Sequence, residues 1–62
     1  MNRVGKRYRL KIPYQNEVLV PKGTELLWND STGDYRATNT NYKSLKFPAE
    51  IVENSIMIFE NL

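Results

Sequence analysis

Strict alternation of apolar and basic residues marks the first structured segment, "RYRLKI", at residues 7–12. The apolar members are Tyr8, Leu10 and Ile12, and the basic members are Arg7, Arg9 and Lys11. A period of two is that of a β-strand with one buried face, so a strand is predicted over residues 7–12. Only residues 1–5 are expected to be loose, as a flexible arm. Pro13 is expected to end the strand or to bend it at a sheet edge.

Short apolar or alternating runs, separated by turn residues, continue along the chain. They predict further strands at residues 17–20, 24–29, 35–38 and 44–47. The connections "PKG" and "DSTGD" are typical of turns in which Gly23 and Gly33 take a positive φ. The regular spacing predicts a mainly β fold: a small antiparallel sheet or SH3-like barrel of four or five short strands.

The C-terminal segment "KFPAEIVENSIMIFENL", residues 46–62, is richer in apolar residues than the rest of the chain. Pro48 is favoured at a helix start and Glu50 near its positive end, so a short helix is predicted over "PAEIVEN". Residues 55–62 fit either a helical face or a strand. We favour a break near Asn54, followed by a turn or strand that places Phe59 in the core. The tail would then close one domain spanning residues 1–62.

The phase of these segments predicts which side chains form the core. The expected members are Tyr8, Leu10, Ile12, Leu26, Trp28, Leu45, Phe47, Ile51 and Phe59. Trp28 has a second interpretation, because an exposed tryptophan is a typical hot spot for a protein partner.

Composition removes most catalytic chemistry. The 62 residues include no cysteine and no histidine, so disulfides, thiolate sites and zinc sites with the usual ligands are excluded. The serines therefore have no obvious activating base. Asp30 and Asp34 flank one loop, where aspartate is common for turn geometry alone. We predict no enzymatic activity, no cofactor and no metal. No apolar run approaches the length of a membrane helix, and no signal peptide is recognised.

Charge is distributed unevenly along the chain. Residues 1–11 carry five bases and no acid, whereas residues 47–62 carry three glutamates and no base. The basic strand face either lines phosphates, with tyrosines as stacking platforms, or is the wet side of an edge strand that blocks aggregation. The acidic tail is either a solvated helix face or a surface that meets the basic strand of a second copy. Because so small a chain has no disulfide or zinc site to stabilise it, we predict a homo-oligomer.

The layout "Y-x-L-K … K-G-T … F-P-x-E-I-V-E-N … F-E" resembles small phage and prophage proteins and appended domains of unknown function. The matching residues are Tyr8, Leu10, Lys11, Lys22, Gly23, Thr24, Phe47, Pro48, Glu50, Ile51, Val52, Glu53, Asn54, Phe59 and Glu60. The resemblance implies a phage or bacterial origin and hence the cytoplasm of a bacterial host cell. It implies no catalytic residues.

The leading functional hypothesis is a non-catalytic binding module that occludes or recruits a host or phage protein. The alternative is a small nucleic-acid-binding accessory protein that uses the basic N-terminal strand, and a structural or virion subunit is a third class. Candidate partner-binding residues are Arg3, Lys6, Arg7, Arg9, Lys11, Tyr14, Tyr35 and Tyr42. A nucleic-acid module should gather its bases and tyrosines on one solvent face, whereas a protein-binding module should expose an apolar patch.

Overall fold

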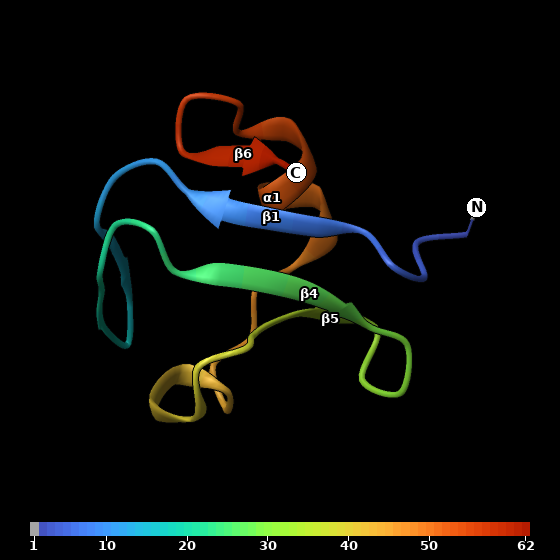
Figure 1. The fold of residues 1–62 in the computed structure, drawn as a ribbon. Helices are drawn as coiled ribbons and strands as arrows, with labels where there is room; N and C mark the ends of the chain where they lie inside the picture. Colours follow the sequence, from blue (N-terminus) through green and yellow to red (C-terminus); the bar gives the residue numbers. More distant parts are fainter. Residues whose placement is uncertain (1) are drawn as a thin grey trace.

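A computed structural model describes residues 2–62; Met1, the first residue of the expected arm, lies outside the described residues. The chain forms a four-stranded antiparallel sheet, a two-stranded hairpin and one short helix, and is therefore mainly β as predicted (Figure 1). The elements are β1 (Arg7–Leu10), β2 (Tyr14–Asn16), β3 (Val18–Val20), β4 (Glu25–Asn29), β5 (Asp34–Ala37), the 3-10 turn η1 (Thr40–Tyr42), α1 (Ala49–Asn54) and β6 (Phe59–Asn61).

The strand order in the larger sheet is β5-β4-β1-β6, which makes β1 an interior strand. It pairs antiparallel with β4 along one edge and with β6 along the other. The interpretation of its basic face as the guard of an edge strand is therefore wrong. The strand also ends at Leu10, two residues earlier than predicted.

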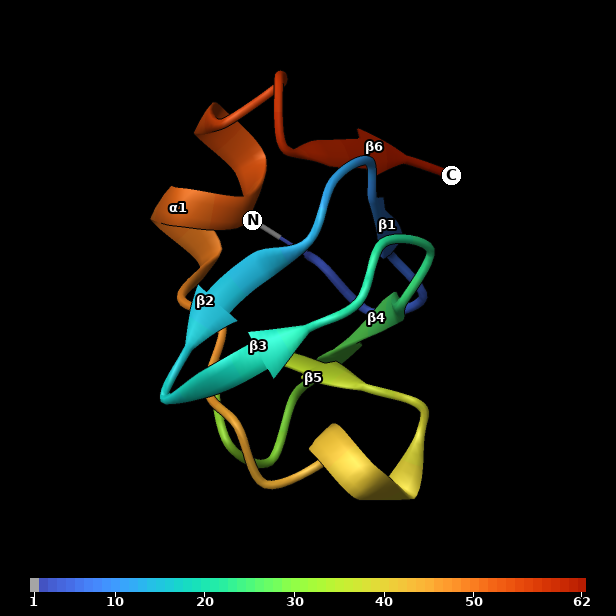
Figure 2. The same ribbon diagram turned by 90° about the vertical axis from the view of Figure 1, so that its left-hand side faces the viewer.

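The segment from β1 to β4 is one long hairpin that bends in its middle. In both ladders, β1 with β4 and β2 with β3, the residue numbers of each pair add to 34. The two ladders therefore share one register. Pro13 and Pro21 directly adjoin the last residue pair of this outer ladder, Tyr14 with Val20. Proline has no N–H to donate, so the ladder is interrupted on both strands at one point. There the outer half of the hairpin turns across the sheet, and in Figure 2 β2 and β3 lie in front of β4 and β5.

The C-terminal segment closes the sheet. Helix α1 ends at Asn54, a turn follows, and β6 pairs with β1 so that Phe59 stands opposite Leu10. Phe59 is buried, as the sequence predicted. Pro48 lies in the cap position and the helix begins one residue later, with Glu50 in its first turn.

Two strand predictions need correction. Residues 44–47 form no strand; Phe47 makes only an isolated bridge to Tyr35, with backbone hydrogen bonds of 2.9 and 3.1 Å. Strand β2, in contrast, was not anticipated after Pro13, and residues 2–62 contain six strands rather than four or five. Gly23 and Gly33 take positive φ values of 89° and 73°, as predicted for their turns.

The core lies between the sheet and the hairpin, with α1 packed against β5 and β6. Its buried members are Tyr8, Leu10, Val20, Leu26, Tyr35, Ala37, Leu45, Phe47, Val52 and Phe59. Three predicted members are not in this set. Ile12 follows the end of β1 and is 46% exposed, Ile51 points outward while its neighbour Val52 points inward, and Trp28 is only half-buried against the core.

Candidate functional site

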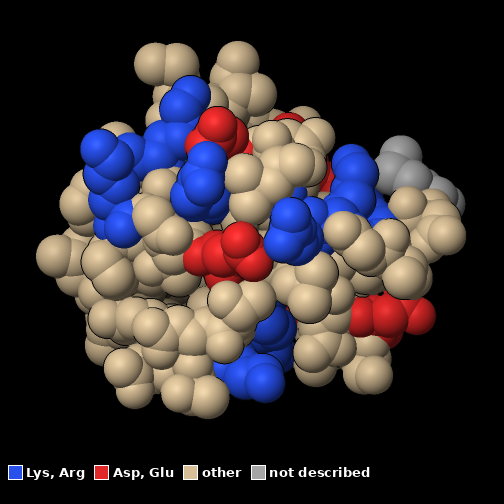
Figure 3. Space-filling view, viewed as in Figure 1, with Lys and Arg blue, Asp and Glu red and all other residues tan. Residues whose placement is uncertain are grey.

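The outer face of the sheet carries the basic residues of β1, and acidic residues stand beside them. Arg9 lies in register between Glu60 on β6 and Glu25 on β4. Its guanidinium donates two hydrogen bonds to Glu60 Oε1, at 3.2 and 2.9 Å. Arg7 lies 3.6 Å from Glu25 Oε1. Figure 3 shows basic and acidic groups side by side over this face, which is therefore not a uniformly positive surface.

A further ion pair secures the start of β5 on the same face. Arg36 donates to both carboxylate oxygens of Asp34, at 2.8 and 3.4 Å, and the Thr32 hydroxyl donates to Oδ1 at 2.6 Å. Burial raises the pKa of Asp34, but the bonds from Thr32 and Arg36 outweigh it, so the pKa lies below its usual value. This carboxylate is held as a structural anion.

Arg3, in the expected arm, is docked onto the body of the protein. Its Nε donates to Glu53 Oε2 at 2.6 Å and its Nη2 to Oε1 at 3.1 Å, the two-point geometry typical of arginine–carboxylate pairs. The guanidinium carbon lies 5.2 Å from the centre of the Trp28 ring, within cation–π range. The pair joins the arm to α1 and β4.

Tyr35 supports this pair from inside the core. Its hydroxyl donates to Glu53 Oε2 at 2.8 Å. The Arg3 hydrogen bonds lower the pKa of Glu53 below its usual value despite partial burial, and Tyr35 adds to that effect. Burial, with the neighbouring carboxylate, raises the pKa of Tyr35 itself. Tyr35 is 0% exposed, so its predicted role as an exposed stacking platform does not hold.

The other candidate residues are spread over different environments. Tyr14 is half-buried and packs on the rings of Phe47 and Phe59, and Tyr42 is half-buried against the core. Lys11 uses its Nζ to donate to the carbonyl of Ile56 at 3.1 Å, and Lys6 is half-buried. The structure therefore brings Arg3 and Tyr35 together through one carboxylate. It does not gather the bases and tyrosines on one face.

Exposed apolar side chains gather where the β1–β6 ladder ends. Lys11 N–H donates to the Ile58 carbonyl at 2.8 Å, and Ile12 and Met57 are the next residues on the two sides of this bond. Ile56 and Met57 are 73% and 77% exposed. We call Ile12, Ile56 and Met57 the turn surface. Sequence analysis placed no candidate here, although the unbroken apolar run of residues 56–59 exceeds what one buried face can hold.

A groove of about 330 Å³ leads away from the turn surface between α1, β1 and β6. Its lining includes Lys11 and Ile56, the buried side chains of Val52 and Phe59, and Glu53. Its volume falls in the lower part of the range typical of ligand sites, roughly 300–1,000 Å³. Both Ile56 of the turn surface and Glu53, whose carboxylate holds Arg3, therefore border this groove.

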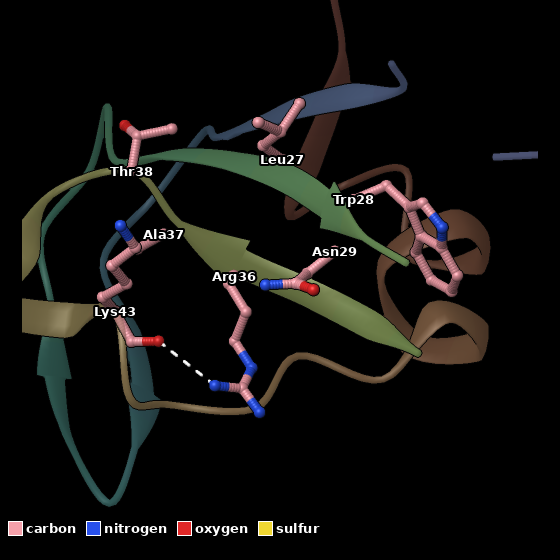
Figure 4. A pocket seen from close by; sticks show the side chains of 7 residues that line it. All are labelled: Leu27, Trp28, Asn29, Arg36, Ala37, Thr38 and Lys43. Atoms are coloured by element: carbon pink, nitrogen blue, oxygen red, sulfur yellow. Dashed lines mark hydrogen bonds between the residues drawn. The ribbon is translucent and has the colours of Figure 1, made fainter. Parts of the chain in front are cut away.

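A second depression, of about 180 Å³, lies over the outer face near β4, β5 and Lys43 (Figure 4). Arg36 is among its lining residues, but this guanidinium is bonded to Asp34 and, at 3.4 Å, to the Lys43 carbonyl. The depression is smaller than typical ligand sites. It is therefore a weaker candidate for a ligand site than the groove beside α1.

Within residues 2–62, no three acidic, histidine or cysteine side chains are grouped so as to hold a metal ion. The same part of the chain has no helix of the length and apolarity required to cross a membrane. Comparisons with protein-family models, curated proteins and solved structures find no match to this chain.

Proposed function

We propose that this chain is a non-catalytic protein-binding module of the phage or prophage type, which occludes or recruits a host or phage protein in the bacterial cytoplasm. The observation that carries the proposal is the turn surface, where Ile56 and Met57 stand 73% and 77% exposed beside Ile12. Contiguous exposed apolar surface is typical of protein contact sites. Methionine is enriched at interfaces and adapts its shape to a partner.

Removal of the apolar turn surface from water would favour binding of a protein partner there. Apolar surface removed from water contributes about 25 cal/mol per Å². The adjacent groove adds polar groups for orientation, since Lys11 and Glu53 lie in its lining. A partner that covers the turn surface and enters the groove would combine an apolar anchor with directional contacts.

The direct test uses charge substitutions on the turn surface. Wild type, the double variant Ile56→Asp with Met57→Asp, and the control Leu19→Asp are immobilised and exposed to lysate of phage-infected bacteria. Leu19 is 62% exposed on β3 and makes a matched control. We expect wild type and control to retain one protein that the double variant loses. Titration with that purified protein should show a loss of at least about tenfold in affinity, or 1.4 kcal/mol. Equal affinity for all three chains would contradict the proposal.

Two finer features form part of the proposal. The bent hairpin that crosses an antiparallel sheet supports an SH3-like description of the fold. Self-association remains a prediction, because small domains often gain stability that way. The expected encounter between the acidic tail and the basic strand of a second copy is likewise a prediction, in which Glu53 and Glu60 would exchange the pairs that they make with Arg3 and Arg9 of the same chain. Sedimentation at micromolar concentrations would test the oligomer: a monomer at every concentration would contradict it.

The nucleic-acid alternative has a separate test. Arg7, Arg9 and Lys11 remain solvent-exposed, but the two arginines already have carboxylate partners. Phosphate contacts release counterions, so binding would weaken steeply with salt. Anisotropy of labelled single-stranded and duplex DNA in low salt should show no binding at tens of micromolar protein. Saturable binding that Arg7→Ala with Arg9→Ala weakens would instead favour the alternative.

A further inference from the structure

Glu53, which lines the groove beside α1, also belongs to a site whose chemistry matches a guanidinium group. Glu53 presents both carboxylate oxygens to the two nitrogens of Arg3, at 2.6 and 3.1 Å, and Trp28 presents its ring at 5.2 Å. A planar fork of donors fits a carboxylate at two points and stacks on an aromatic face, which an ammonium group does not reproduce. The site is therefore selective for arginine over lysine.

The groups that form this site are held in place by the rest of the protein. The buried Tyr35 hydroxyl orients the Glu53 carboxylate at 2.8 Å, and Trp28 Nε1 donates to Asp30 at 3.2 Å. The Trp28 and Tyr35 rings meet edge to face with centres 5.1 Å apart. None of these contacts involves Arg3. The receptor should therefore keep its shape when Arg3 leaves.

The arm that supplies Arg3 is attached through little else. Among the described residues, three hydrogen bonds join residues 2–5 to the rest of the chain: the two from the Arg3 side chain to Glu53, and one in the adjacent turn from the Lys6 N–H to the Arg3 carbonyl at 3.0 Å. Asn2 and Val4 are exposed, and Gly5 has a φ of 85° that favours glycine. Release of Arg3 would break one ion pair and one ring contact without disturbing the sheet.

The Arg3 side chain therefore stands where a ligand's side chain would be expected. We propose that Glu53, Trp28 and Tyr35 form a receptor for an arginine of the protein partner, and that Arg3 occupies this receptor until that arginine displaces it. The inference rests on the proposed protein-binding function and identifies a chemical feature of the partner. A partner segment that contacts the turn surface can follow the groove from Ile56 to Glu53, since both residues line it.

The tethered Arg3 acts as a built-in competitor. Because Arg3 is attached by a short turn that precedes β1, its effective concentration at the site is at least in the millimolar range, so an external arginine must exceed this level to compete. Removal of Arg3 should increase the apparent affinity of the site for an external guanidinium. Replacement of Arg3 by lysine should give an intermediate result, because the charge is kept and the two-point geometry is lost.

Trp28 is the sole tryptophan of the sequence and reports directly on the site. Its fluorescence is measured while N-acetyl-arginine amide, or N-acetyl-lysine amide, is added to wild type, Arg3→Ala and Arg3→Lys. We expect Arg3→Ala to give a saturable change with the arginine compound. Binding should be at least about tenfold weaker with the lysine compound, the ratio expected when one charged hydrogen bond is lost. It should also be weaker in wild type, because there the tethered Arg3 competes for the site. Adding Glu53→Gln to Arg3→Ala should abolish the response.

Arg9→Ala is the matched control, because it removes an arginine paired with another glutamate on the outer face. It should behave as wild type, and circular dichroism should show that each variant is folded. No saturable response in folded Arg3→Ala, or equal responses to both compounds, would overturn the proposal. A wild-type dimer that disappears in Arg3→Ala would also overturn it, since the arginine would then come from a second copy. These measurements use no partner, so their failure leaves the lysate test of the proposed function intact.

Discussion

The two halves of the bent hairpin share one register but have different surroundings. The central half, β1 with β4, has β6 along one edge and β5 along the other. The outer half, β2 with β3, forms a separate two-stranded sheet. Tyr8, Leu10 and Leu26 of the central half are buried, whereas Val20 is the buried residue of the outer half and Leu19 is 62% exposed.

Intrinsic β-strand propensity alone would predict that the outer half is the more stable of the two. The "VLV" of β3 contains two β-branched residues, which are strong strand formers, whereas β1 reads "RYRL". The central half is nevertheless the better buried, because each of its strands has a neighbour on both sides. The difference teaches that, in this chain, burial and strand neighbours decide which segment carries the stability.

The sharpest test is the same substitution in each half. Leu10→Ala removes a side chain that is 1% exposed and should lower the free energy of unfolding by about 2–5 kcal/mol. That is comparable to the whole stability that a core of this size supplies, about 3–5 kcal/mol. Leu19→Ala should change it by less than about 0.5 kcal/mol. Urea titrations followed by circular dichroism measure both, and equal losses would refute the comparison.

Polar anchoring of β5, the neighbour of the central half, to α1 gives the next effect. Tyr35→Phe keeps the ring but removes the hydrogen bond to the Glu53 carboxylate. We expect a loss of about 1.5–3 kcal/mol, the range for a hydrogen bond to a charged group. Tyr14→Phe, on the outer half, is the matched control, since its hydroxyl makes no hydrogen bond within residues 2–62. An unchanged melting temperature for Tyr35→Phe would show that the anchor adds nothing.

Acid should act first on the central half, because Glu53 and Asp34 contact its neighbouring elements. The pKa of each carboxylate is lower in the folded chain than its ordinary value. Their contributions are therefore complete above about pH 5, just above the usual carboxyl pKa range, and are lost as pH falls through the folded-state pKa values. Melting temperature should fall on acidification below this pH, and less steeply in Glu53→Gln. Parallel curves for wild type and Glu53→Gln would contradict this assignment.

The smallest effects come from turns with positive φ. Glu17, at the tip of the outer half, has a φ of 61°, and Gly33, between β4 and β5, has 73°. Glu17→Gly should stabilise the fold by about 0.5–1 kcal/mol by relieving backbone strain. Gly33→Ala should destabilise it by about 1 kcal/mol, although its added Cβ would meet no atom within 4 Å. Thermal melts compare the two, and shifts in the same direction would refute the strain argument.

Local patterns in the sequence predicted the parts of the fold that depend on near neighbours. Alternation found the inward side chains of β1, and the turn glycines marked the ends of β4. Prediction failed where contacts between residues far apart in the sequence determine the structure. Ile12 continues the alternation, yet Pro13 and Pro21 turn the chain out of the sheet there. Ile51 and Val52 are adjacent in a helix of six residues, too short for periodicity to fix which faces the core.

The candidate site depended still more on distant contacts. Arg3 and Glu53 are separated by 50 positions, and no local pattern indicates that they meet. The sequence showed a basic beginning and an acidic end, which we interpreted as surfaces for other molecules. Register then set Arg9 beside Glu60 in the folded chain. Tyr35 illustrates a signal that was available: Asp34 and Arg36 flank it and share the opposite face of β5, which leaves Tyr35 facing inward.

The position of β6 has a consequence for the order of folding. The Arg9–Glu60 contact joins residues 51 positions apart, so most of the chain must be drawn into one closed loop before the last strand can pair. Closure of such a loop costs entropy before any contact repays it, and chains rich in these contacts fold slowly for their size. The central hairpin needs a much shorter loop. We therefore expect β1 and β4 to pair early and β6 to be both the last strand to join and the first to leave. Hydrogen exchange at the β6 amides would then be faster than at those of β4.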